Sequence, residues 1–333
     1  MSKNLKNTPL LFLTAIIWGF AFVAQLDSAT KIGGFTYNGT RFMLGALSLV
    51  PVILIFDRGK QFAGFNKHLQ KGLVAGILLF TASSLQQIGI IITNSAGKAG
   101  FMTGLYTVLV PVISFLFLKK KSSINIWLGA ALALSGLFML CILGSTTNSS
   151  GETSENVGMI VEFIKGAVPS SAFEWVGMGL LFISAIFWAL HIIYIDSVIA
   201  DLSSLKFSAV QFMVCSLLSW CVALITEVTS VASTWAQITD AGIAILYGGI
   251  LSVGVAYTCQ SIGQRGANPT YAAIVLSTES IFSAIGEMLF YILLLGQTDY
   301  VGLGPWGYAG CAVMFGGIVV SQLEFKKRTK VNT

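Results

Sequence analysis

The chain has 333 residues, of which 55% are hydrophobic and only 10% are charged, and its mean hydropathy is +0.82. A soluble domain carries about a quarter charged residues, so this chain lacks the charge to cover a surface that faces water. The composition therefore excludes an ordinary soluble domain and indicates a lipid environment. The net charge of +5 is modest, and the basic residues form no continuous stripe, so we expect no nucleic-acid partner.

Ten apolar segments have the length needed to cross a bilayer, which is about 20 residues. Because lipid offers no hydrogen-bond partners to an open strand, each segment is expected to be a helix. We therefore predict an all-α membrane protein with ten transmembrane helices. In chain order, the predicted helices lie at 8–26, 35–56, 72–92, 99–118, 124–143, 175–195, 206–226, 241–263, 268–294 and 304–322.

The distribution of basic residues predicts how the chain is inserted. If the N-terminus is cytoplasmic, the cytoplasmic segments hold 15 of the 19 Lys and Arg residues. By the positive-inside rule, both termini are then cytoplasmic. The first apolar segment follows MSKNLKNTPL without a cleavage site, so we expect a retained helix. We expect a multi-pass protein of a bacterial plasma (inner) membrane, in contact with the lipid bilayer; the sequence does not indicate an oligomeric state.

The ten predicted helices divide into two sets of five. We expect a first five-helix repeat at 1–143, an extracytoplasmic loop at 144–174, a second five-helix repeat at 175–325 and a basic cytoplasmic tail at 326–333. Within the loop, the stretch VGMIVEFIKGAV is a candidate for a short helix at the membrane interface.

Several short matches relate the two halves at an offset of about 170 residues. Trp18 corresponds to Trp188, and Arg41 corresponds to Gln211 with Phe-Met following in both. VPVISFLF of the fourth segment aligns with ESIFSAIG of the ninth. Because five is an odd number, the second copy enters the membrane from the opposite side. We therefore predict two inverted-topology repeats, an arrangement that is typical of secondary transporters.

The sequence resembles the EamA-like branch of the drug/metabolite transporter superfamily. The residues that carry the resemblance, besides the five-plus-five organisation, are Trp18, Gly19, Arg41, Phe42, Pro111 and Glu279. The family usually has Glu-Pro where this chain has Glu279-Ser280, so a helix-kinking proline is missing here. The resemblance implies export or uptake of metabolites, amino acids or amphipathic drugs without ATP hydrolysis, and we expect export.

Three ionisable residues within the predicted helices are candidates for substrate binding or proton coupling, because such groups are costly at membrane depth. Glu279, near the middle of the ninth helix, is either a proton-coupling or cation-binding group or half of a structural pair. Arg41 is either a clamp for a substrate anion or a scaffold contact. His191 could change its charge near neutral pH, or it could be a buried, hydrogen-bonded histidine.

Amide and aromatic side chains complete the predicted site. Amides in lipid normally face a cavity or another helix, and aromatic rings suit a flat or cationic substrate, although they more often serve packing. The further principal candidates are Gln87, Gln260, Trp18, Trp188, Tyr106 and Tyr271. Further residues of the same kind within the predicted helices are Gln86, Gln211, Phe22 and Tyr257.

The sequence favours a secondary transporter for a small organic metabolite, such as an amino acid or an amphipathic amine, that works by alternating access. A membrane channel or sensor is the alternative. No HExxH, GxSxG or GxxxxGK[ST] motif occurs, so we expect neither an enzyme nor an ATP-driven pump. The five cysteines show no ligand spacing, and we expect no metal and no cofactor.

Overall fold

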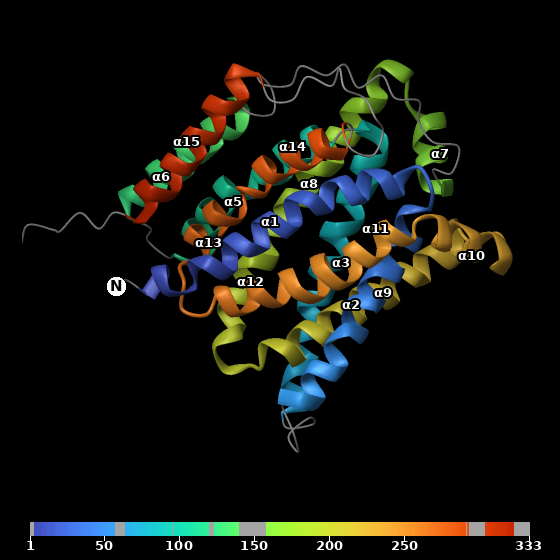
Figure 1. The fold of residues 1–333 in the computed structure, drawn as a ribbon, viewed down its shortest axis with the longest axis horizontal. Coiled ribbons are helices and arrows are strands. Elements are labelled where there is room, and N and C mark those ends of the chain that lie inside the picture. The colour runs from blue at the N-terminus through green and yellow to red at the C-terminus, as the bar shows by residue number, and fades with distance from the viewer. Residues whose placement is uncertain are drawn as a thin grey trace, which may run out of the picture.

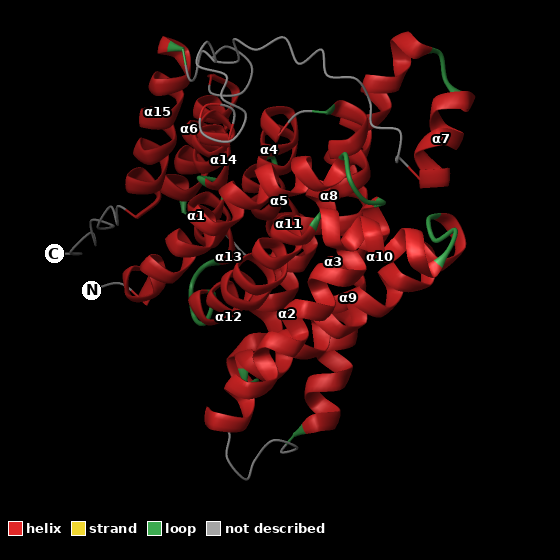
Figure 2. Cartoon of the chain, turned by 45° about the vertical axis from the view of Figure 1, so that its right-hand side comes forward, coloured by secondary structure: helices red, strands yellow, loops and turns green. Residues whose placement is uncertain are grey.

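The structure of the protein is a computed structural model. The described residues are 3–56, 64–94, 96–119, 123–139, 158–290, 292 and 304–322. They form helices joined by short connections and include no strand, which agrees with the predicted all-α class (Figures 1 and 2). The first part of the predicted loop, 144–157, and the basic tail 326–333 lie outside the described residues.

The helices of the described chain have the following bounds, in sequence order. They are α1 (Lys3–Ala29), α2 (Gly34–Phe56), α3 (Phe65–Thr93), α4 (Ala96–Gly104), α5 (Tyr106–Leu118), α6 (Ile124–Phe138), α7 (Gly158–Ala167), α8 (Ser170–Val198), η2 (Ile199–Asp201), α9 (Ser204–Thr226), α10 (Val231–Asp240), α11 (Gly242–Leu246), η3 (Tyr247–Tyr257), α12 (Thr258–Gly263), α13 (Pro269–Leu276), α14 (Glu279–Leu289) and α15 (Pro305–Gln322).

Eight helical segments in the described part of the chain are long and apolar enough to cross a membrane. They coincide with eight of the ten predicted helices. The fifth and tenth predicted helices correspond instead to the shorter apolar helices Ile124–Phe138 and Pro305–Ser321. These two, α6 and α15, pack against each other at one edge of the bundle (Figure 1).

Two of the shorter helices lie between the predicted membrane segments. α7 falls within the stretch VGMIVEFIKGAV, where a short helix was predicted. α10 was not predicted, because its sequence was assigned to a connection. The side chain of Ser230 caps α10 by accepting a hydrogen bond from the backbone N–H of Ser233 at 3.1 Å, which is a local signal for a helix start.

The fourth and ninth predicted helices are both interrupted. The first break separates α4 from α5 at Leu105, and the second separates α13 from α14. No proline follows Glu279, yet the ninth helix breaks just before it. The hydroxyls of Ser277 and Thr278 donate to the carbonyls of Ile274 and Val275 at 2.9 and 2.7 Å. Such local side-chain bonds compete with the regular helix and account for a break without proline.

The eighth predicted helix also departs from regular geometry. It consists of α11, the π-helical segment η3 and α12 in direct succession. π-Helical turns are rare and often occur at functional sites. η3 ends at Tyr257, a residue of the central cavity described below.

The first helix of each half packs mainly against the other half. α1 lies against α14, η3, α12 and α13, whereas α8 lies against α3, α4 and α5. Gly19 permits the close approach of α1 to α14, because a Cβ at this position would lie 2.6 Å from the backbone oxygen of Glu279. The two halves are therefore interlocked, and the central residues come from both of them.

Two helix N-termini are capped by side chains from distant parts of the chain. The carboxylate of Glu227, which follows α9, accepts hydrogen bonds from the backbone N–H groups of Phe35 and Thr36 in α2 at 2.9 and 2.7 Å. At the opposite end of α9, Nε2 of His68 accepts a hydrogen bond from the backbone N–H of Ser203 at 3.0 Å. Both contacts join the first half of the chain to the second.

Candidate functional site: a central cavity between the two halves

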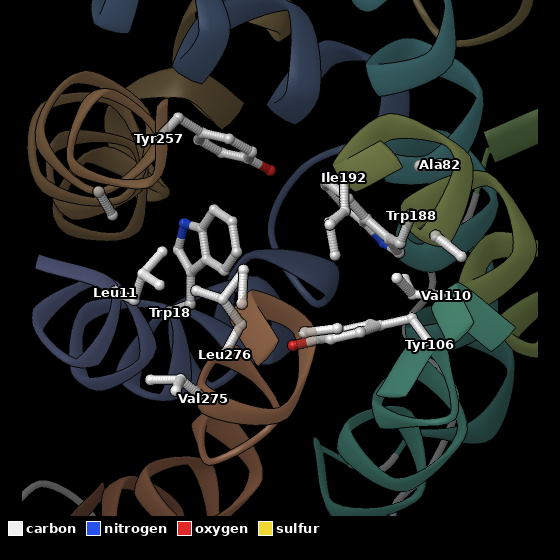
Figure 3. Packing of buried hydrophobic residues seen from close by; sticks show 14 of the residues in the cluster. Leu11, Trp18, Ala82, Tyr106, Val110, Trp188, Ile192, Tyr257, Val275 and Leu276 are labelled. Carbon is white, nitrogen blue, oxygen red and sulfur yellow. The ribbon is translucent and has the colours of Figure 1, made fainter. Parts of the chain in front are cut away.

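Aromatic side chains from four helices meet in the middle of the bundle. The ring of Trp18 lies 4.6 Å from that of Tyr257 and 6.2 Å from that of Trp188, measured between centroids. Trp188 and Tyr257 stack at 6.1 Å. Figure 3 shows Trp18 and Tyr257 facing Trp188 and Tyr106 across a common space. The two tryptophans related by the 170-residue offset thus lie next to each other.

These rings surround a cavity of about 30 Å³, which is large enough for only a few water molecules. We call it the central cavity. Its lining residues are Trp18, Ala21, Phe22, Gln25, Arg41, Gln86, Thr103, Tyr106, Trp188, Ile192, Ser252, Tyr257, Gln260 and Glu279. The lining includes six of the nine principal candidates and comes from both halves of the chain.

Glu279 supplies a carboxyl group to the central cavity. It is the first residue of α14, directly after the break, and only 3% of it is exposed. The hydroxyl of Tyr106, the first residue of α5, donates a hydrogen bond to its Oε1 at 3.0 Å. Within the described part of the chain, Glu279 takes part in no ion pair. The site therefore holds a buried acid whose observed partner is uncharged.

Arg41 supplies a guanidinium group to the same cavity and is also only 3% exposed. Its Nε donates to Oδ1 of Asn38 at 2.9 Å, and its Cζ lies 5.0 Å from the ring centre of Tyr37 and 4.8 Å from that of Phe42. Such contacts stabilise a buried cation. Among the described residues, no carboxylate forms an ion pair with Arg41.

Amide groups line the rest of the central cavity. Oε1 of Gln86 accepts a hydrogen bond from the indole N–H of Trp188 at 2.6 Å, and its Nε2 donates to Oε1 of Gln25 at 3.1 Å. Gln260 is fully buried, and neither atom of its amide has a hydrogen-bond partner in the described chain. The same holds for the buried hydroxyl of Thr103. The cavity therefore presents unused donors and acceptors.

Three principal candidates do not line the central cavity. His191 is fully buried and its Nε2 lies 2.9 Å from Oε1 of Gln211, with its ring against the edge of Trp188. Gln87 donates from Nε2 to the backbone oxygen of Gln25 at 3.2 Å. The hydroxyl of Tyr271 lies 2.7 Å from that of Thr8. These residues occupy packed positions around the site.

Three polar lining residues were not predicted from the sequence: Gln25, Thr103 and Ser252. Gln25 could have been found by the criterion that selected the other amides, since it is an amide within an apolar helix. Ser252 takes part through its backbone oxygen, which accepts the indole N–H of Trp18 at 3.3 Å. A backbone contact of this kind leaves no signal in the residue type.

Metal binding finds no support in the described part of the chain, where no group of three or more His, Cys, Asp or Glu residues could hold an ion. The arrangement is suited to binding an organic solute through buried charges, amides and rings.

Comparison with known proteins identifies the family. The EamA-like transporter family model matches residues 7–142 and 175–321. An "Uncharacterized transporter" of Archaeoglobus fulgidus is 30% identical over 151 residues, which are 45% of this chain and 42% of that protein. The "Uncharacterized transporter YoaV" of Bacillus subtilis is 22% identical over 246 residues, 73% of this chain and 74% of that protein. The chain thus spans less than half of the archaeal protein's length.

A solved crystal structure has the same fold. It superimposes with a TM-score of 0.64 and covers 95% of this chain and 96% of the other, at 17% sequence identity. The resemblance deduced from the sequence is confirmed by the family match, which covers both halves of the chain. The chain belongs to the EamA-like transporter family.

Proposed function

We propose that this chain is a secondary carrier that moves a small zwitterionic solute, such as an amino acid, through the central cavity by alternating access. One observation carries the proposal: a buried guanidinium, Arg41, and a buried carboxyl group, Glu279, line one aromatic cavity without an ion-pair partner in the described chain.

The energetics of buried charge favour a zwitterion. A buried ion is costly unless it is paired and hydrogen-bonded, and neither Arg41 nor Glu279 has an opposite charge as partner among the described residues. A solute carboxylate placed on Arg41 would form a charge-assisted pair, bidentate in favourable geometry. The solute ammonium would then face Glu279. A solute with both charges satisfies both residues, whereas an amine or an acid satisfies only one.

The rest of the lining suits the body of such a solute. Trp18, Trp188 and Tyr257 offer ring faces and edges to an apolar side chain, and Gln260 offers an amide with no partner in the described chain. Binding sites for small molecules usually enclose about 300–1,000 Å³, far more than the cavity of about 30 Å³ seen here. We therefore propose that this conformation is closed and that helices separate to admit the solute.

We further propose ten membrane-spanning helices in two inverted repeats, 1–143 and 175–325, joined by an extracytoplasmic loop and followed by a cytoplasmic tail, with both termini cytoplasmic. Three features support the repeats. α1 and α8 each pack against the other half, the fourth and ninth helices are both interrupted, and Trp18 adjoins Trp188. Discontinuous helices at corresponding positions of two repeats are characteristic of binding sites in secondary transporters.

The proposed direction is export, with proton coupling at Glu279. A carboxyl group buried beside a phenol can hold a proton in one state and a solute ammonium in another, so that binding of one excludes the other. The alternative is a channel. The flux through a channel would not saturate as the solute concentration rises, whereas the flux through a carrier would, so a flux measurement distinguishes the two.

The proposal is tested by thermal unfolding of the purified protein with amino acids, nucleosides, polyamines and quaternary amines. The amino acid that stabilises most is then compared with its amide, which lacks the carboxylate, and its N-acetyl derivative, which lacks the ammonium. We expect the zwitterion to raise the unfolding temperature and both derivatives to fail. Equal stabilisation by the amide would contradict the role of Arg41.

A further inference from the structure

Unpartnered polar atoms gather on three neighbouring helices, beyond the central cavity. Nδ1 of His191, Nε2 of Gln211, Oε1 of Gln264 and both amide atoms of Gln260 are buried without a hydrogen-bond partner in the described part of the chain. They lie on α8, on α9, and on α12 or the residue that caps its C-terminus. Gln260 borders the central cavity. His191, Gln211 and Gln264 lie beyond the lining of that cavity.

Direct contacts join these helices around the unpartnered atoms. Nε2 of His191 lies 2.9 Å from Oε1 of Gln211, and the hydroxyls of Ser208 and Ser261 lie 3.4 Å apart. The Nε2 of Gln264 donates to the backbone oxygen of Ile192 in α8 at 3.1 Å. We give the name polar track to the six residues that provide these polar side chains: His191, Ser208, Gln211, Gln260, Ser261 and Gln264.

The polar track is fully buried, and polar groups without a hydrogen-bond partner are unusual in a protein interior. All six side chains have no exposed surface. A buried polar atom without a partner carries the full cost of its desolvation, so native interiors keep few of them. Several such atoms side by side require an explanation. Water or solute that reaches them in another conformation would satisfy them and offset this cost.

The helix that carries Gln260 and Ser261, and is followed directly by Gln264, is suited to movement. α12 is six residues long and lies between the π-helical segment η3 and a turn in which Gly266 has a φ of +71°. Because a π-helix has a different register from an α-helix, a local change in η3 would rotate α12 relative to α8 and α9. Such a rotation would separate Ser261 from Ser208.

We infer that the polar track is the closed half of the solute pathway, leading from the central cavity to the end of the bundle where α8 is connected to α9. This inference rests on the proposed carrier function and extends it. The track opens when α12 moves away from α8 and α9, and it then conducts a small hydrated polar solute between Gln260 and the aqueous phase. By the proposed topology, this end faces the cytoplasm.

The experiment measures which buried positions water-soluble reagents can reach. Ser261→Cys and, in a second protein, Ser208→Cys are introduced into a chain whose five native cysteines are replaced by alanine. The proteins are reconstituted in vesicles, and a small membrane-impermeant methanethiosulfonate is added to one side at a time. Ser216→Cys is the matched control, because Ser216 is equally buried on α9 but donates to the backbone oxygen of Gly39 at 2.7 Å.

We expect Ser261→Cys and Ser208→Cys to react only from the side of the α8–α9 connection, at least about tenfold faster than Ser216→Cys, since a minor open state suffices for modification. Failure of both track cysteines to react, reaction from the opposite side, or equal reaction of all three would overturn the inference. The readout needs no substrate. A chain that reacts as expected but transports no zwitterion would therefore refute the proposed solute and leave the pathway intact.

Discussion

The hydroxyl of Tyr106 donates a hydrogen bond to the carboxyl group of Glu279 across 3.0 Å. Each residue is the first of a helix that follows a break, Tyr106 in α5 and Glu279 in α14. A second contact runs beside it, from the hydroxyl of Ser280 to the backbone oxygen of Gly100 at 3.0 Å. The two interrupted helices are therefore joined near their breaks, next to the central cavity.

Glu279→Gln should abolish the response of transport to a pH gradient while leaving the protein folded. The amide oxygen can still accept the hydrogen bond of Tyr106, but the side chain can no longer exchange a proton. The solute ammonium also loses a charged acceptor, a hydrogen bond of about 1.5–3 kcal/mol, so we expect transport to fall about tenfold or more. The measurement is uptake by proteoliposomes with and without a pH gradient; an unchanged response would rule out proton coupling at Glu279.

Tyr106→Phe is the companion variant for Glu279→Gln. It removes the hydrogen bond but keeps the carboxyl group and most of the ring contacts. We expect it to retain the response to the pH gradient with its midpoint moved along the pH axis. A complete loss of the response in Tyr106→Phe would indicate that the hydroxyl itself is essential.

Gln260→Leu should make the protein more stable and less active. Its two buried amide atoms have no hydrogen-bond partner in the described chain, so an apolar side chain of similar size removes an unfavourable contribution of about 1–3 kcal/mol. The measurement is thermal unfolding together with transport. Gln86→Leu is the control, because both amide atoms of Gln86 are hydrogen-bonded and its loss should be destabilising. A destabilised Gln260→Leu protein would show that Gln260 has a structural role.

Glu227 should link stability to pH, since burial raises the pKa of its carboxyl group while hydrogen bonds from Phe35 and Thr36 act in the opposite direction. A group whose pKa is raised by folding stabilises most at low pH, and this contribution is lost as the pH rises through the raised pKa. Relative to Glu227→Gln, the wild type should therefore lose stability as the pH rises above about 4.3, the ordinary pKa of Glu.

The pH dependence of Glu227 can be checked by thermal unfolding of the two proteins across the same pH series. Glu227→Ala is a further comparison, because it removes the cap of α2 and should cost about 0.5–2 kcal/mol at every pH. A stability advantage of the wild type over Glu227→Gln that grows with rising pH would contradict the prediction.

The proposed orientation predicts which exposed lysines face the outside. Lys67, near the start of α3, should be cytoplasmic, and Lys165, on α7, should be extracytoplasmic; both are exposed. In intact cells, an impermeant thiol reagent should label Lys165→Cys and leave Lys67→Cys unmodified until the membrane is opened. Labelling with the reverse preference would contradict the proposed topology.

Hydrophobic run length was sufficient to predict the eight long apolar helices of the described chain, because lipid permits few alternatives to a helix. It failed for α10, whose helix depends on a serine cap and not on an apolar run. It also could not predict the breaks at Leu105 and before Glu279. The second break depends on the orientation of two hydroxyls, Ser277 and Thr278, and serine or threonine within a helix need not bond in this way.

Residue type predicted much of the central cavity but not its boundaries. Charges and amides in apolar helices, such as Arg41, Glu279 and Gln260, are costly enough to be informative by themselves. His191 and Tyr271 are also polar residues within apolar helices. They contact Gln211 and Thr8 instead and do not line the cavity. Whether a polar residue faces a cavity or a neighbouring helix depends on helix rotation, which a single sequence does not specify to within one residue.

Joint binding of a zwitterion by Arg41 and Glu279 can be measured as exchange of a labelled amino acid for the same unlabelled amino acid across proteoliposome membranes. The amino acid used is the one that stabilises the purified protein most. We expect saturable exchange in the wild type, weaker binding in Arg41→Lys because a lysine cannot form the bidentate pair, and no exchange in a folded Arg41→Met protein. Undiminished exchange in Arg41→Met would show that Arg41 does not bind the solute carboxylate.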